Sequence, residues 1–535
     1  MWLSQQKDRH LQIETECTAA PPRAFLQSPR LHGLLRGLIF LLAAFFLLLF
    51  LYTALRRMRY PFELEWIESG ILMSVRRIVH GHALYVAPSL DFVPFLYAPL
   101  YFYVAAVLTK LTGVTYTTLR LVSTLSTLGS CALIYAFIAT ETRRRLAAIA
   151  GVGLFLACYP LVEAFYDIGR VDSLFVFFML LALFFSRRGH PILAALAWVL
   201  CFQTKQTILP VALVLLCADW QYPRRILIGL ATFMAGLGAS MAWINHATHG
   251  WYYFYLFQIA GGFPVVWRQA VLYLPNALLA PVGIALVLGL AAWASTGVHL
   301  GSRTGSFYAS VTAILYAAIG FVVAHQGAAV NALIPVYAWT AVLFGVALDR
   351  LLTRLGRSTD PRACLVTTVI LVAAAVQLAM FTYNPGRYLP PPAVRAARQR
   401  FIDQVHALPG DIYIYSHTYD AVLAGKQSHA EDQAVGAVLY GSNAAVANDL
   451  RAELDNALHS HRYSAIVVDG PLSQQPIHFQ DEYPYAVSAE SEVSRYLTSQ
   501  PTWILLPCST ATTIAPTIMR EDTSVHRGKC SATQP

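Results

Sequence analysis

Residues 37–68 read GLIFLLAAFFLLLFLYTALRRMRYPFELEWIE, and this stretch decides the fold class. The apolar part, 37–55, is long enough to cross a bilayer, which takes about 20 residues. Arginines follow at once and no small-residue cleavage site precedes them, so we interpret the run as an anchor rather than a signal peptide. Three acidic residues come next: Glu63, Glu65 and Glu68. Charges beside hydrocarbon cost about 2.5–3.5 kcal/mol, so they indicate a functional site.

The composition of the whole chain agrees with a polytopic membrane protein. Of its 535 residues 56% are hydrophobic and 13% are charged, and the mean hydropathy is +0.51. The net charge is +9, but the arginines lie in short loops between apolar runs, as in membrane proteins. We therefore expect a lipid bilayer as partner and no nucleic acid.

The apolar runs predict eleven spans with the N-terminus inside and the C-terminus outside. The spans are 37–55, 120–140, 146–162, 171–186, 191–202, 207–218, 226–244, 276–294, 307–324, 332–348 and 364–382. This topology places the arginine-rich loops on the cytoplasmic side, as the positive-inside rule requires. The two spans beside Lys205 are short, and without them Lys205 moves to the inner side. Residues 1–33 are predicted to be a disordered cytoplasmic tail.

The apolar stretch 95–108 is left out of that count. It is interrupted by Pro99 and is shorter than the roughly 20 residues of a span, so we interpret it as an interfacial helix. Counting it as a span would send the arginine loops outside. The stretch 71–79 is predicted to be a second interfacial helix, and 56–119 is then one large outer loop.

The ionisable residues at the ends of apolar runs all fall on the outer face in this topology. They are Glu63, Glu65, Glu68, Asp167, Arg170, Asp172 and Lys205. A transporter would instead place charges and broken helices near the bilayer midplane, in paired halves of the chain. The spans here are mostly uncharged at their centres and show no such internal repeat. The pattern therefore favours one site at the outer water boundary.

Residues 383–535 predict a small outer α/β domain. Helices are expected at 394–408 and 444–459, and strands at 411–416, 464–468 and 503–506. Cys508 and Cys530 both lie in this domain and can pair if the compartment is oxidising, although their spacing does not decide it.

The order of these features resembles the GT-C integral-membrane glycosyltransferases, here represented by residues 34–382. The resembling residues are Gly81, Leu84 and Tyr85, then Tyr97-Ala98-Pro99-Leu100-Tyr101, Arg120, Arg170-Val171-Asp172-Ser173-Leu174 and Lys205. Within that class the chain is most similar to the family 39 group, which includes bacterial relatives of protein O-mannosyltransferases and of the lipid A aminoarabinose transferase.

The resemblance implies an inverting hexosyl or pentosyl transfer at the outer face. The donor would be a polyprenyl-phosphate-linked sugar and the acceptor a hydroxyl of a glycan, lipid or protein. It implies a base at Glu65, with Glu63 and Glu68 as fallbacks, and a second acid at Asp172, with Asp167 as its competitor. Lys205 and Arg170 would hold the donor phosphate. Substrate contacts are expected from Asp167, Tyr85, Tyr97, His325 and Asn331.

The chemistry asks for the same residue types, because the acceptor proton needs a carboxylate and the leaving phosphate needs cations. A divalent metal, Mg²⁺ or Mn²⁺, stays open, with Glu63, Glu65 and Asp172 as possible oxygen ligands.

Each assignment has a structural alternative. Glu63 and Glu68 can pair with Arg56, Arg57 or Arg59 at the membrane surface. Asp172 can cap a helix, and Lys205 can extend to the interface. At the level of function, the alternatives are a lipid-linked sugar flippase or transporter and a non-catalytic envelope assembly protein. The location we expect is the inner (plasma) membrane, with the C-terminal domain periplasmic or extracellular.

Overall fold

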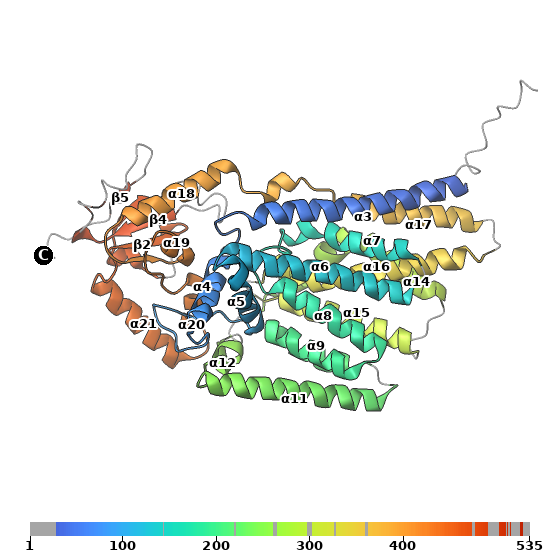
Figure 1. Cartoon of the computed structure of the whole chain (residues 1–535), viewed down its shortest axis with the longest axis horizontal. Coiled ribbons are helices and arrows are strands. Elements are labelled where there is room, and N and C mark those ends of the chain that lie inside the picture. Colours follow the sequence, from blue (N-terminus) through green and yellow to red (C-terminus); the bar gives the residue numbers. More distant parts are fainter. Residues whose placement is uncertain are drawn as a thin grey trace, which may run out of the picture.

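The computed structural model describes residues 28–142, 144–218, 221–259, 265–296, 302–325, 328–358, 362–472, 477–489, 502–509, 511, 514 and 525–527. A bundle of long helices occupies one end of the molecule and a small sheet with its own helices occupies the other (Figure 1). We call the latter part, which follows α17, the outer domain, after the place that the predicted topology gives it.

Helices account for every predicted span. The bundle consists of α3 (Pro29–Met58), α6 (Tyr116–Glu141), α7 (Arg145–Ala157), α8 (Asp172–Arg188), α9 (Pro191–Thr204), α10 (Leu209–Leu216), α11 (Pro223–Ala247), α14 (Ala280–Thr296), α15 (Arg303–Val323), α16 (Ile334–Leu355) and α17 (Arg362–Ala379). Shorter helical pieces are η1 (Tyr159–Val162), η2 (Gln206–Ile208), α12 (Trp251–Tyr253), η3 (Phe254–Ile259), α13 (Trp267–Tyr273), η5 (Leu274–Leu279) and η6 (Val330–Leu333). Within the described residues, eight helical segments are long and apolar enough to cross a membrane. The predicted polytopic helical class is therefore confirmed.

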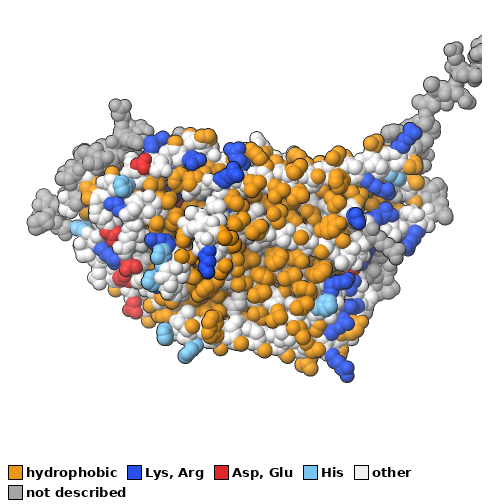
Figure 2. Space-filling model, in the orientation of Figure 1, with side chains coloured by type: hydrophobic (Ala, Val, Ile, Leu, Met, Phe, Trp, Pro, Cys, Tyr) orange, Lys and Arg blue, Asp and Glu red, His pale blue; other side chains and the backbone are white. Residues whose placement is uncertain are grey.

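The apolar surface of the bundle agrees with a lipid environment. Helix α16 is its central helix and buries Trp339 and Phe344, whereas α3 exposes Leu41 and Leu48. Figure 2 shows hydrophobic side chains covering the middle of the visible face, with Lys and Arg side chains gathered at the end away from the outer domain. Exposed leucines of this kind are stable in contact with lipid.

The loop after α3 carries the two short helices expected from the sequence. They are α4 (Glu68–Val79) and α5 (Leu100–Thr112), which follows Pro99. Both lie between the bundle and the outer domain (Figure 1). Helix α5 has 13 residues and is too short to cross a bilayer.

The outer domain is built on a five-stranded sheet in the order β1-β2-β4-β3-β5. Its elements are η7 (Pro385–Tyr388), α18 (Pro392–Ala407), β1 (Ile412–Ile414), α19 (Thr418–Leu423), α20 (Asp432–Leu439), α21 (Ala444–His459), β2 (Ala465–Asp469), η9 (Phe479–Asp481), β3 (Tyr485–Ser488), β4 (Thr502–Leu506) and β5 (Val525–Arg527). Strands β1 and β2 are parallel, with Ile412 beside Ala465, and the other pairs are antiparallel. Strands β3 and β5 and helices α19 and α20 were not predicted.

One cysteine prediction is tested in part. Cys508 is disulfide-bonded, whereas Cys530, its expected partner, lies outside the described residues. Cys131, Cys158 and Cys201 are buried in the bundle as free thiols.

Candidate functional site

A loop and a helix start bring Glu65 and Arg170 together from distant parts of the sequence. Glu65 lies in the irregular loop between α3 and α4, and Arg170 lies just before α8. Nη1 of Arg170 donates to Oε1 of Glu65 over 2.8 Å. The other oxygen of Glu65 accepts from the backbone N–H of Ile67 at 3.2 Å.

Asp172 and Lys205 continue this row of charges. Asp172 is the first residue of α8, and Lys205 directly follows α9. Because α8 and α9 are consecutive helices joined by a tight turn at Gly189, the start of one lies beside the end of the other. Nζ of Lys205 donates to Asp172 at 2.8 Å, Nε of Arg170 lies 3.4 Å from the same carboxylate, and the Asn331 side chain also hydrogen-bonds it.

The row Glu65–Arg170–Asp172–Lys205 is largely buried but reaches water at one end. Side-chain exposure is 9% for Glu65, 6% for Arg170, 2% for Asp172 and 14% for Lys205. Burial raises the pKa of Glu65 to about 7, although Arg170 opposes this shift. A carboxylate with a pKa near 7 can take up a proton under physiological conditions, which is what a general base must do.

Tyr97 extends the row on the side of Arg170. Its hydroxyl accepts from Nη2 of Arg170 at 2.9 Å, and its backbone oxygen accepts from the hydroxyl of Tyr85 at 2.6 Å. Tyr85 is buried and packs edge to face on Tyr252. Of the predicted substrate contacts, Tyr97 and Asn331 thus contact residues of the row, and Tyr85 contacts Tyr97.

Glu68 belongs to a different contact set. Arg120, which the sequence indicated only as one of the resembling residues, donates to both carboxylate oxygens of Glu68, at 3.0 and 2.6 Å. The backbone N–H groups of Leu64 and Gly169 donate to it as well. Both side chains of the Arg120–Glu68 pair are 0% exposed. The pair closes the loop against α6 and leaves the Glu68 carboxylate no access to a substrate.

The remaining candidates lie apart from the row. Glu63 faces the outer domain, where it pairs with Arg398 and His417. Asp167 pairs with Arg57 at 3.4 Å and accepts from Tyr159. Nδ1 of His325 forms a hydrogen bond with the backbone oxygen of Phe321, one turn earlier in α15. The suggested surface pairing of Glu63 and Glu68 with Arg56, Arg57 or Arg59 is wrong, because their partners are Arg398 and Arg120.

The outer-domain residues that face the loop, Arg398 and His417, were not predicted. Arg398 lies on the apolar side of α18, with Phe401, Ile402 and Val405 three, four and seven residues later. A charge inside an apolar stripe at helical spacing is a signal of a buried ion pair. The partner could not be deduced, because Glu63 is 335 residues away in the chain.

The site does not offer a clear metal cage. Among the described residues, no group of three or more His, Cys, Asp or Glu side chains is placed to hold a metal ion. The carboxylates of Glu65 and Asp172, named as possible ligands, already accept from Arg170 and Lys205. A divalent metal stays a prediction of the sequence.

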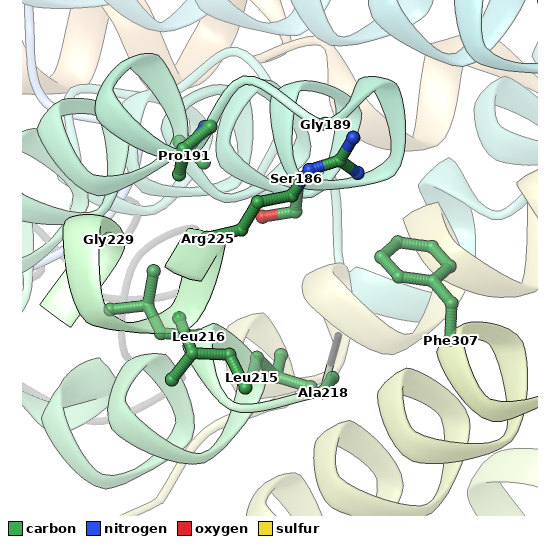
Figure 3. A pocket seen from close by; sticks show the side chains of 11 residues that line it. Ser186, Gly189, Pro191, Leu215, Leu216, Ala218, Arg225, Gly229 and Phe307 are labelled. Atoms are coloured by element: carbon green, nitrogen blue, oxygen red, sulfur yellow. The ribbon is translucent and has the colours of Figure 1, made fainter. Parts of the chain in front are cut away.

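Two pockets in the described structure lie outside the row. One lies between helices at the turn from α8 to α9, where Ser186, Gly189 and Arg225 line it (Figure 3). This turn is at the opposite ends of α8 and α9 from Asp172 and Lys205, about 20 Å away by helix length. The other opens between Phe257 and Gln258 of η3 and the start of α21.

The comparison with solved structures decides the fold. A crystal structure of ArnT from Cupriavidus metallidurans in the apo state matches with a TM-score of 0.56 at 13% identity, covering 88% of this chain and 97% of that one. A second structure, of the same ArnT bound to undecaprenyl phosphate, matches with a TM-score of 0.54 at 12% identity, covering 88% and 98%. The chain has the GT-C fold.

That result confirms the fold expected from the resemblance. No protein-family model matches the sequence, and no curated protein sequence matches it. At 12–13% identity the likeness carries the fold and no residue roles. Roles must therefore be argued from the contacts of this chain.

Proposed function

We propose that this protein is a glycosyltransferase that moves a sugar from a polyprenyl-phosphate-linked donor to an acceptor hydroxyl at the outer face of the inner membrane. The observation that carries the proposal is the row Glu65–Arg170–Asp172–Lys205: a carboxylate whose pKa is about 7 pairs with Arg170, and Asp172 joins Arg170 to a second cation, Lys205. The ArnT fold supports it, and one ArnT structure contains undecaprenyl phosphate.

The two cations suit a phosphate leaving group. Arg170 presents a planar set of donors that matches phosphate oxygens, and Lys205 adds a positive charge at the exposed end of the row. Both now pair with carboxylates, so a donor phosphate would replace Glu65 as the partner of Arg170. That exchange frees the Glu65 carboxylate at the moment the donor binds.

Glu65 would then act as the base. It takes the proton of the acceptor hydroxyl, the acceptor oxygen bonds to the anomeric carbon, and the carbon–oxygen bond to phosphate breaks with its electron pair on the phosphate. Attack from the face opposite the phosphate inverts the anomeric centre. Asp172 holds Arg170 and Lys205 in place, as its ion pairs with both indicate. Hexose and pentose donors both fit this scheme.

The proposed orientation rests on charge. The row lies at the ends of α8 and α9 that face the outer domain, whereas Arg187, Arg188 and Arg225 lie at the opposite ends. The positive-inside rule places the arginine end in the cytoplasm, so the row faces outward. The N-terminus is then cytoplasmic, because α3 ends beside Glu65.

The test replaces Glu65 by Gln in cells and measures lipid-linked sugars by mass spectrometry. Cells that lack the protein should accumulate a polyprenyl-phosphate-linked sugar, and the wild-type protein should clear it. Glu65→Gln should slow clearance by about 10²–10⁴-fold, the usual contribution of a general base. Glu163→Gln, the same change at an exposed glutamate of an outer loop, serves as the matched control.

Normal clearance by a folded Glu65→Gln protein would contradict the assignment of the base. The pH dependence gives a second criterion. Since the base must be deprotonated and its pKa is about 7, the rate in membranes should fall as the pH drops through 7.

A further inference from the structure

The loop that carries Glu65 belongs in part to the outer domain. Tyr60 and Phe62 are 8% and 4% exposed and pack in one apolar cluster with Phe401 and Val405 of α18. Strands β1, β2 and β4 contribute to the same cluster. The chain just before the proposed base is therefore part of the core of a domain that begins more than three hundred residues later.

Glu63 reinforces this packing with buried charges. Nη2 of Arg398 donates to Oε1 of Glu63 over 2.8 Å, and Nδ1 of His417 contacts the same oxygen. Arg398 also pairs with Asp420, and Nε2 of His417 pairs with Asp469 at the end of β2. Side-chain exposure does not exceed 2% except at Asp469, where it is 9%.

These contacts hold Glu63 more firmly than a surface ion pair would. Burial disfavours the charged imidazole, yet the carboxylates of Asp469 and Glu63 outweigh it and raise the pKa of His417 to about 10. His417 is thus a cation at neutral pH. Release of Glu63 into water would give up its hydrogen bond to Arg398 and its contact with His417, so the pairing of Glu63 is favoured over its release.

The same loop is held from the membrane side by Arg120. Its guanidinium donates to the backbone oxygens of Tyr60 and Phe62, each at 2.6 Å. Glu65 is two residues beyond Glu63, a distance of at most about 7 Å along an extended chain. A movement of Glu63 toward or away from the outer domain is therefore transmitted to Glu65.

We propose that the outer domain positions the catalytic base, with Arg398 and His417 as positioning residues that act through Glu63. This inference rests on the proposed role of Glu65. It gives the outer domain a part in the reaction beyond any selection of the acceptor, because the start of the loop packs in the core of that domain.

The test measures the protonation of Glu65 directly, in the full-length protein in detergent. Dicyclohexylcarbodiimide modifies protonated carboxyl groups, and mass spectrometry of the peptide containing Glu65 gives the extent of labelling at each pH. The wild-type midpoint should lie near 7. In Glu63→Gln and Arg398→Lys the loop should become more mobile, and the carboxylate of Glu65 should become more exposed to water. Since burial is the main cause of its raised pKa, the midpoint should fall by about one unit or more.

The variants are chosen to fold and to separate position from charge. Glu63→Gln removes one of three carboxylates that face two cations, so it strands no charge. Arg398→Lys keeps every charge and changes only the geometry. Asp469→Asn is the matched control, because it removes the same charge from the same cluster at a residue outside the loop. Arg170 and Glu68, the charged groups that act on Glu65, are unchanged throughout.

The expected result is a lower midpoint in Glu63→Gln and Arg398→Lys and an unchanged midpoint in Asp469→Asn. An unchanged midpoint in the first two, with thermal unfolding showing folded protein, would overturn the inference, as would an equal shift in all three. Labelling does not depend on turnover. A failure here is therefore distinct from a failure of the proposed function, which shows as sugar transfer by Glu65→Gln.

Discussion

Glu65 lies three residues before Glu68, the first residue of α4, and each pairs with an arginine, yet their surroundings differ. The carboxylate of Glu68 accepts two bonds from Arg120 and two from backbone N–H groups, and the pair is fully buried. The carboxylate of Glu65 accepts one bond from Arg170 and one backbone N–H, in a row that is open to water at Lys205.

The pKa values follow from this difference. Burial alone would raise both, but Arg120 and the backbone donors outweigh it at Glu68 and lower its pKa. At Glu65 burial prevails over Arg170, and the pKa rises to about 7. A carboxylate whose oxygens already accept four hydrogen bonds is a structural element. A carboxylate with fewer hydrogen-bond donors, in a row that is open to water, can exchange protons and partners. Saturation by donors, rather than burial, separates the two glutamates.

The largest effect that tests this comparison is on stability. Glu68→Gln leaves the charge of Arg120 buried without its partner and should lower the free energy of unfolding by about 3–5 kcal/mol. Glu65→Gln should cost little, because Arg170 keeps its pair with Asp172 and its bond to Tyr97. Thermal unfolding of both variants in detergent measures the contrast. Equal losses, or a larger loss in Glu65→Gln, would contradict the division into a structural and a functional glutamate.

A second test concerns the open end of the row. Lys205→Gln removes a cation that a phosphate would contact, while Asp172 keeps Arg170 and Asn331 as partners. A charged hydrogen bond contributes about 1.5–3 kcal/mol, so the Kd for undecaprenyl phosphate should rise by about 10–100-fold. Lys110→Gln on the exposed face of α5 is the control. The phosphate role of Lys205 is wrong if both variants bind equally well in a titration.

The sequence predicted the helices and placed seven charges on one face. Four of these charges meet in the row, whereas Glu63, Glu68 and Asp167 pair elsewhere. Each predicted span is a helix because lipid contact imposes long apolar runs, and Glu65, Arg170, Asp172 and Lys205 meet because each ends or begins such a run on one side of the bundle. The predicted topology thus placed these four charges at the same end of the helix bundle. The catalytic roles given to them stay predictions.

The choice of partners was not predictable from the sequence. Neighbouring arginines at 56–59 suggested local pairs for Glu63 and Glu68, but packing selected Arg398 and Arg120, which are distant in sequence. In the outer domain, β3 and β5 were missed because short strands carry little periodic signal. Side-chain pairing and the shortest strands depend on tertiary contacts that no local pattern encodes.

The smallest effect distinguishes two tyrosines of one motif. The hydroxyl of Tyr97 accepts from Arg170 of the row. The hydroxyl of Tyr101, four residues later, is buried and donates to the backbone oxygen of Leu119. Tyr97→Phe removes one hydrogen bond, worth about 1 kcal/mol, and should slow clearance of the lipid-linked sugar by about fivefold with no change in thermal unfolding. Tyr101→Phe should lower the unfolding temperature and leave the clearance rate per folded molecule unchanged. If the effects were exchanged, the water-accessible row would not be the functional side of the loop, because a saturated buried contact would then control the rate.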